Sequence, residues 1–189
     1  MSLSRQKLER ELLRIFTRPN VVKTREHARR LWWETYDVYA RDAQDVSGDD
    51  VLQVNSYRFL KSLRFDSLNN YLQAADEFDA AFRAYWQGAT FNVGQLIVTA
   101  PSTCPNVGGN GVWSTETASV VSRVRRRALT GRLVPVFQRQ SQVADAERAA
   151  AEIAQAFHET TTKDVLVTIT GFDTSTPTPI AISNTCTVF

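Results

Sequence analysis

The chain has 189 residues, of which 43% are hydrophobic and 10% aromatic, and its formal net charge is +2. This length suffices for one ordinary domain or two small ones, and the apolar content excludes a globally disordered chain. No apolar run approaches the roughly 18 uncharged residues of a membrane helix, so we expect no membrane span. Two cysteines cannot form a four-ligand zinc site, and only two histidines can add to them, so we expect no metal and no cofactor.

Charge is distributed unevenly along the chain. Residues 1–65 carry a net charge of +4, residues 66–110 a net charge of −3, residues 111–140 a net charge of +5 and residues 141–189 a net charge of −4. Surfaces of opposite sign on one protein attract further copies of that protein. The bands therefore predict self-association, although a set of separate solvated faces explains them equally well.

The first 88 residues are predicted to be mainly helical. Apolar side chains recur at helical spacing in residues 8–16, 23–43, 52–63 and 68–86. The last of these stretches is the clearest, because nine apolar side chains follow one continuous stripe. Ser4 fits an N-cap for the first helix, and Gly88 fits a stop for the last.

After Gly88 the sequence pattern changes. The predicted strands are residues 91–99, 112–124 and 164–171. We expect a Gly/Pro-rich loop at residues 101–111 and a helix at residues 143–158. The apolar segment 129–137 predicts a short helix that ends before Pro135, because proline disrupts a helix interior.

These elements together predict an α+β fold, with three to four helices followed by a small, mainly antiparallel sheet and one or two further helices. We expect a helical bundle at residues 1–88, an α+β region at residues 89–172 and a C-terminal extended arm or closing strand at residues 173–189. Since no flexible Gly/Ser linker separates these parts, packing as a single domain is the alternative.

An arginine row is the most conspicuous charged group, and its members are Arg123, Arg125, Arg126 and Arg127. On a continuing strand, Arg123, Arg125 and Arg127 project to one side. Such crowded guanidinium groups repel one another unless anions face them, so we expect an interface or a DNA-facing channel here. One interpretation is contact with nucleic-acid phosphates. The other, which we favour, is ion pairing between subunits with acids such as Asp145, Glu147 or Glu152.

Another acidic group lies in the clearest predicted helix. Asp76, Glu77 and Asp79 resemble a carboxylate cluster, but on a helix only Asp76 and Asp79 share a face. We interpret the group as a solvated helix face.

Candidate catalytic groups are few. His27 and His158 lie on separate predicted helices, and neither Cys104 nor Cys186 lies in a recognisable nucleophile motif. We expect free thiols rather than a disulfide. The glycines of residues 108–111 lack the lysine and hydroxyl that complete a phosphate-binding loop, so turn chemistry explains them. We therefore expect no catalytic residues and no enzyme.

Two apolar features suggest interfaces. Adjacent helix positions point about 100° apart, so Trp32 and Trp33 cannot readily enter one core face together. One of them is expected at an interface, unless a helix packed on two sides buries both. The C-terminal segment carries no charged side chain after Asp173, so it needs a partner edge within its own sheet or on a neighbour. Its candidate interface side chains are Ile180, Ile182, Val188 and Phe189.

A helical N-terminal half, a Gly/Pro loop between strands, an arginine row and an apolar C-terminal segment together resemble the structural proteins of the tailed-bacteriophage neck. These are head-to-tail connector, adaptor or tail-completion proteins. The resemblance concerns the plan of the whole chain and rests on no diagnostic motif. It implies a non-enzymatic virion protein, made in the host cytoplasm, that forms an oligomeric ring around a DNA channel. Implied partners are copies of itself, other portal, neck or tail proteins, and non-specifically contacted DNA.

Two alternatives from other classes remain. One is a monomeric nucleic-acid-binding or regulatory module that uses residues 123–127. The other is an enzyme whose site is dispersed along the chain.

Overall fold

The structure is a computed structural model that describes residues 3–17, 24–44, 51–66, 70–91, 96–97, 112–114, 121–142, 145–173 and 180–188. Six helices are described: α1 (Arg5–Thr17), α2 (Arg25–Ala40), α3 (Ser56–Ser62), α4 (Tyr71–Trp86), α5 (Ala128–Gln142) and α6 (Ala146–Asp164). Seven strands are described: β1 (Val51–Gln53), β2 (Thr90–Phe91), β3 (Leu96–Ile97), β4 (Val112–Ser114), β5 (Val121–Val124), β6 (Val165–Asp173) and β7 (Ile180–Thr187).

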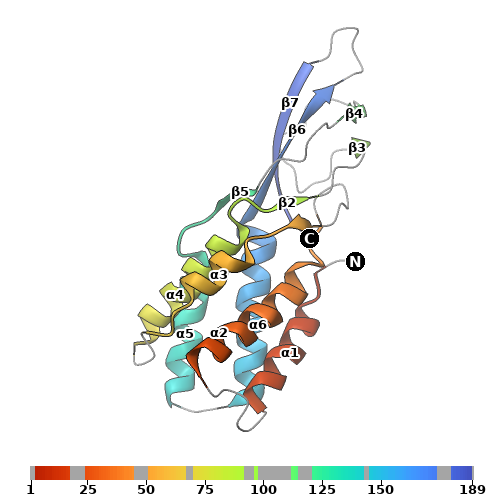
Figure 1. Cartoon of the computed structure of the whole chain (residues 1–189). Coiled ribbons are helices and arrows are strands. Elements are labelled where there is room, and N and C mark those ends of the chain that lie inside the picture. Colours follow the sequence, from red (N-terminus) through yellow and green to blue (C-terminus); the bar gives the residue numbers. More distant parts are fainter. Residues whose placement is uncertain are drawn as a thin grey trace.

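The helices form the body of the molecule, and the β6–β7 hairpin projects from one end of that body (Figure 1). Helix α1 packs against α6, although the two lie near opposite ends of the chain. Helix α5 packs against both α4 and α6. Helices from both halves of the sequence therefore share one bundle.

Local sequence explains where several helices begin. The Oγ of Ser4 accepts a hydrogen bond from the N–H of Lys7, which confirms the N-cap expected for α1. Thr24 and Asn70 cap α2 and α4 in the same way. The glycine expected to end α4, Gly88, has a positive φ of 78°.

Helix α5 contradicts the expectation of a short helix that ends before Pro135, because it continues to Gln142 with the proline inside it. Proline removes one intrahelical hydrogen bond and crowds the carbonyl four residues earlier, at Gly131. The helix persists because it is packed on the neighbouring helices. Leu133 and Val136 are buried, and the ring of Phe137 lies against a phenylalanine of α4.

The strands are antiparallel throughout the described residues. β7 pairs with β6 of the same chain over eight residue pairs, from Leu166 opposite Thr187 to Asp173 opposite Ile180. On the other side of β6, β5 pairs with its first residues and β4 with its last. β3 pairs with β4, while β1 and β2 form a separate two-stranded pair.

The hydrophobic core lies mainly in the helical body. The large side chains with almost no exposure include Tyr36, Phe59, Phe82, Trp86 and Phe157, all of which come from helices. A single cluster of buried residues extends along the chain from Leu3 to Val188. The strand ends add a few aliphatic side chains to this cluster.

The expected α+β fold is therefore wrong. The molecule is mostly helical, and α5 and α6 complete a bundle with the earlier helices instead of accompanying a sheet. The body buries helix faces against one another, and the strands extend away from it. The β-branched runs after Gly88 suggested a sheet layer beneath the helices, but the apolar stripes of the helices suffice to cover each other.

Candidate functional site

The arginine row lies where β5 ends and α5 begins. β5 ends at Val124, and a turn follows at Arg126 and Arg127. Arg127 has a φ of 62°, in the left-handed region that residues other than glycine rarely adopt. The predicted strand therefore stops before most of the row, and the alternation expected for Arg123, Arg125 and Arg127 does not apply.

Asp79 of α4 holds this turn in place. Its carboxylate accepts hydrogen bonds from the backbone N–H groups of Arg127 at 3.3 Å and Leu129 at 3.1 Å. It also accepts from the guanidinium of Arg83 at 2.7 Å, and only 1% of its surface is exposed. A buried carboxylate on one helix thus caps the first turn of another, where backbone N–H groups would otherwise lack partners.

The other two acidic residues of this group have similar roles. Asp76 accepts a hydrogen bond from the hydroxyl of Thr130 at 2.8 Å and lies 3.7 Å from the guanidinium of Arg127. Glu77 accepts from the N–H of Phe65 at 2.8 Å, and Phe65 also has a positive φ, of 56°. The interpretation as a solvated helix face is therefore wrong. In the described part, the two non-glycine residues with positive φ are both held by carboxylates of α4.

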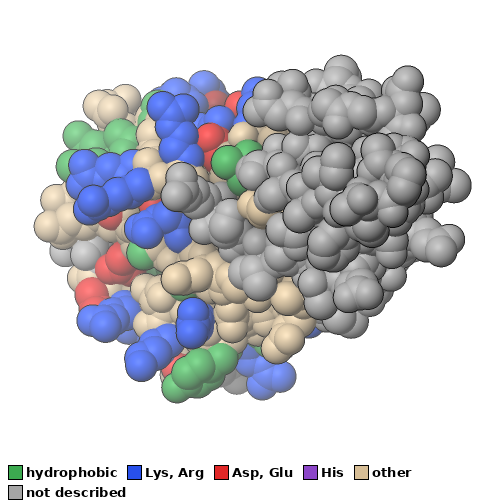
Figure 2. All heavy atoms as spheres, turned by 90° about the horizontal axis from the view of Figure 1, so that it is seen from above, with side chains coloured by type: hydrophobic (Ala, Val, Ile, Leu, Met, Phe, Trp, Pro, Cys, Tyr) green, Lys and Arg blue, Asp and Glu red, His purple; other side chains and the backbone are tan. Residues whose placement is uncertain are grey.

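Positive charge at the turn is only partly neutralised. Arg125 and Arg126 are exposed, and neither forms an ion pair with a described residue. Arg127 is exposed too, and its contact with Asp76 is long. Seen from the end where the strands project, Lys and Arg side chains are prominent on the described part of the surface (Figure 2).

Two of the acids expected to face the arginines from a neighbouring copy are already engaged within the chain. Asp145 caps α6 by accepting from the N–H of Arg148 at 3.0 Å. Glu152 pairs with Arg139 and with Arg148, each at 3.0 Å. Burial opposes ionisation of Glu152, but the hydrogen bonds and charges of these two arginines lower its pKa.

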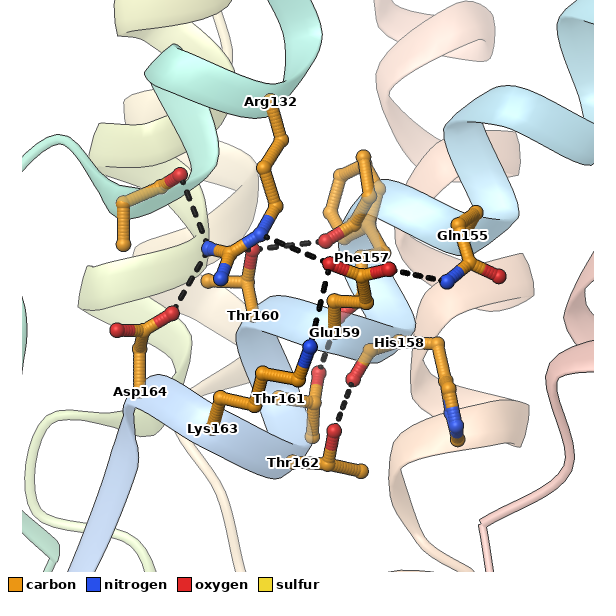
Figure 3. A network of polar contacts seen from close by, with 12 residues as sticks. Arg132, Gln155, Phe157, His158, Glu159, Thr160, Thr161, Thr162, Lys163 and Asp164 are labelled. Atoms are coloured by element: carbon orange, nitrogen blue, oxygen red, sulfur yellow. Dashed lines mark hydrogen bonds and ion pairs between the residues drawn. The ribbon is translucent and has the colours of Figure 1, made fainter.

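A second polar cluster joins α5 to the C-terminal half of α6, next to the start of β6 (Figure 3). Arg132 donates to Asp164 at 2.8 Å and to Thr160 at 3.1 Å, and its guanidinium lies 3.5 Å from Glu159. A hydrogen bond from Gln155 and nearby positive charges lower the pKa of Glu159, although burial opposes this. The cluster fixes the point at which the helical body becomes the hairpin.

A groove of about 440 Å³ lies beside this cluster, between α1, α5 and α6. Each of its three arginines has a partner in the protein. Arg5 donates to Gln155 at 2.7 Å, Arg139 pairs with Glu152, and Arg132 has the contacts given above. Arg132 and Arg139 are thus neutralised by carboxylates, whereas the partner of Arg5 is a neutral amide.

The two histidines are not brought together. His158 lies near the C-terminal end of α2, where its Nδ1 is 2.8 Å from the hydroxyl of Tyr39. His27 lies at the other end of α2, where its backbone N–H bonds the cap residue Thr24. The catalytic pairing considered for the sequence was of a histidine with a cysteine, and for Cys104 it stays untested. Cys104 and residues 108–111 lie outside the described residues.

Both tryptophans contribute to the chain's own core. The ring of Trp32 lies 4.7 Å from that of Phe78, centroid to centroid, and 5.9 Å from that of Phe16. Trp33 is half-buried and packs against the same cluster. A helix packed on two sides accounts for both indoles, as the alternative from the sequence allowed.

The candidate residues of the C-terminal segment have different positions. Ile180 and Ile182 lie in β7, opposite Asp173 and Gly171 of β6. Val188 is 1% exposed and belongs to the core of the helical body. Phe189 lies outside the described residues. The described outer edge of β7 has no strand partner.

Among the described residues, no group of three or more His, Cys, Asp and Glu side chains is placed to hold a metal ion. The described helices also include none that is long and apolar enough to cross a membrane. Comparisons with known protein families, with curated proteins and with solved structures found no match to this chain.

Proposed function

We propose that this chain is a non-enzymatic structural protein of a tailed-phage virion, in which several copies form a ring around a DNA channel at the head–tail junction or tail end. The observation that carries the proposal is the projecting β6–β7 hairpin (Figure 1). β7 offers eight residues whose outer edge lacks a partner within the described part of the chain. A long open edge is a template for a strand from another molecule.

The geometry favours assembly that continues from copy to copy. β7 forms one edge of the paired strands, whereas β3 and β5 lie on the other side of β6. If the edge of one copy meets a different surface of the next, the contact is heterologous, and such contacts close into rings or extend as filaments. The bands of opposite net charge along the sequence are consistent with that kind of contact.

The experiment is a pair of matched double-proline variants in β7. Successive residues of an antiparallel strand direct their N–H groups to opposite sides, and proline removes the N–H. Therefore Ala181→Pro/Ser183→Pro and Ile182→Pro/Asn184→Pro remove donors from opposite edges. One variant should lose the hairpin. The other should keep the fold but no longer form the oligomer seen for the unmodified chain by native mass spectrometry.

The result is decisive in either direction. A protein that remains monomeric at high concentration and in the presence of purified portal and tail proteins would contradict the proposal. Normal assembly of both proline variants would remove β7 as its basis. The second candidate, a monomeric nucleic-acid-binding module, is favoured by Arg125 and Arg126, which are exposed and form no ion pair with the described residues. It predicts DNA binding by a protein whose mass stays that of one chain.

A further inference from the structure

We propose that the β5–α5 turn binds the phosphate backbone of double-stranded DNA without reading its sequence. The turn is defined as Arg125–Arg127. This inference deepens the proposed function, because it names the partner of one surface of the subunit, and it replaces the preference for subunit ion pairs drawn from the sequence.

The first argument is the charge that remains after internal pairing. Asp79, a buried carboxylate that bonds this turn, already accepts two backbone N–H groups and pairs with Arg83. It is therefore occupied and cannot also neutralise Arg125 and Arg126. Among the described residues, these three consecutive exposed guanidinium groups share one weak ion pair, that of Arg127 with Asp76. Such concentrated charge of one sign favours a polyanion.

The second argument is that the backbone of the turn is held in place. The N–H of Arg125 donates to the carbonyl of Asp164 at 3.4 Å, and the N–H of Ala128 donates to the carbonyl of Arg125 at 3.3 Å. The carboxylate of Asp79 accepts a hydrogen bond from the N–H of Arg127 and so holds the positive-φ backbone of that residue in place. The arginines are thus presented from an ordered backbone, which reduces the entropy lost on binding.

The third argument concerns the kind of partner. A protein interface usually has an apolar centre that excludes water. Here three charged side chains are consecutive, and the flanking Val124 and Ala128 are half-buried. Guanidinium groups form strong paired hydrogen bonds with phosphate. The N–H of Leu129 is used by Asp79 and that of Ala128 by the carbonyl of Arg125, so the arginine side chains are the binding groups, and this favours contact along a backbone over a specific anion pocket.

The test measures binding of the full chain to fluorescent duplex DNA of two unrelated sequences at several salt concentrations. Each lost phosphate contact reduces the slope of log K against log salt by about 0.9. Arg125→Gln/Arg126→Gln should therefore reduce the slope by about 2 for each bound subunit and weaken binding at low salt by about tenfold. Arg125→Lys/Arg126→Lys should keep the slope, and both DNA sequences should give the same result.

The matched control is Arg14→Gln/Arg30→Gln, which removes the same net charge from exposed arginines paired to Glu11 and Glu34. This control should keep the slope of the unmodified protein. An equal loss in the control, or an unchanged slope in Arg125→Gln/Arg126→Gln, would overturn the inference. Polyglutamate that binds the turn more tightly than DNA would also overturn it, in favour of an acidic protein partner.

Assembly of the same variants without DNA separates this inference from the proposed function. A monomeric protein that still shows the slope change at Arg125 and Arg126 would support the DNA contact and contradict the ring. A protein that assembles normally but lacks the slope change would contradict the DNA contact alone. An unchanged thermal midpoint of the double variant shows that the fold is intact, as expected for exposed side chains.

Discussion

The helical body and the projecting hairpin are built in different ways. In the body, several buried polar groups bond side chains of other helices, as where the hydroxyl of Tyr36 meets Thr161 at 3.0 Å and the indole of Trp86 at 2.7 Å. The hairpin relies on backbone pairing along one side of β7, and the described part of its other side is open. The comparison teaches that most of the stabilising side-chain contacts lie in the body, whereas the described outer edge of β7 is free to accept a partner strand.

The largest effect on stability is expected from a substitution in the core of the helical body. Trp86 is fully buried and bonded to Tyr36, so Trp86→Ala should lower the free energy of unfolding by about 3–5 kcal/mol, because it leaves a cavity and removes one of the two hydrogen bonds of the Tyr36 hydroxyl. Urea unfolding measures the change. Tyr57→Ala, at a side chain that is 75% exposed, should change the free energy by less than about 0.5 kcal/mol. Equal losses for both variants would contradict the location of the core.

The next largest effect is expected at Asp79, the buried carboxylate that bonds the β5–α5 turn. Asp79→Ala should destabilise by about 3 kcal/mol, because it leaves the charge of Arg83 and the N–H groups of Arg127 and Leu129 without their partner. Asp76→Ala should cost less, about 1–2 kcal/mol, since it removes one hydroxyl hydrogen bond to a half-exposed carboxylate and a long ion pair. Thermal unfolding ranks the two, and a larger loss for Asp76→Ala would contradict the capping role of Asp79.

A smaller effect of opposite sign is expected in α5. Pro135 is exposed inside this helix, so Pro135→Ala should stabilise the body by about 1–3 kcal/mol by restoring a backbone hydrogen bond. Chemical denaturation measures the gain. Gly131→Ala serves as the control for helix propensity, because a Cβ there meets open space, and it should stabilise by about 1 kcal/mol. Destabilisation by Pro135→Ala would contradict this prediction, because it would show that the proline stabilises the body more than the restored hydrogen bond does.

The smallest effect concerns acidification. Burial and the charge of Arg5 lower the pKa of His158 below its ordinary 6.5, against the opposing charge of Glu159. The unfolded chain then binds a proton more readily than the folded one, so stability is full above pH 6.5 and falls as the pH drops below it. His158→Gln should flatten this part of the stability profile, which urea unfolding at several pH values measures. A profile unchanged by this substitution would contradict the assignment.

The sequence predicted best those features that depend on near neighbours. The apolar stripe of residues 68–86 and the stop at Gly88 predicted α4, and Ser4 predicted the start of α1. The residues 112–124 predicted a strand, and β4 and β5 lie at its two ends on the same side of β6. These predictions succeeded because periodicity and capping act over a few residues.

The sequence failed where distant contacts decide the structure. The donors that Asp79 satisfies lie 48 and 50 residues away, and no local pattern indicates such a pairing. For the same reason Pro135 was expected to end a helix that packing on α4 and α6 maintains. The fold class was wrong because the paired strands add length to the molecule without forming a layer under its helices.

The direct continuity of α6 and β6 has a mechanical consequence. The helix ends at Asp164 and the strand begins at the next residue. Val188, which follows β7 at the base of the hairpin, lies in the core. Nineteen helical residues span about 28 Å and nine strand residues about 30 Å, so the two elements form a lever with nearly equal arms. The two elements meet at Asp164, whose carboxylate forms an ion pair with Arg132 of α5. A sideways load on the hairpin tip would therefore reach the far end of α6 as a torque, and α1 and α5, which pack on that helix, would have to resist it.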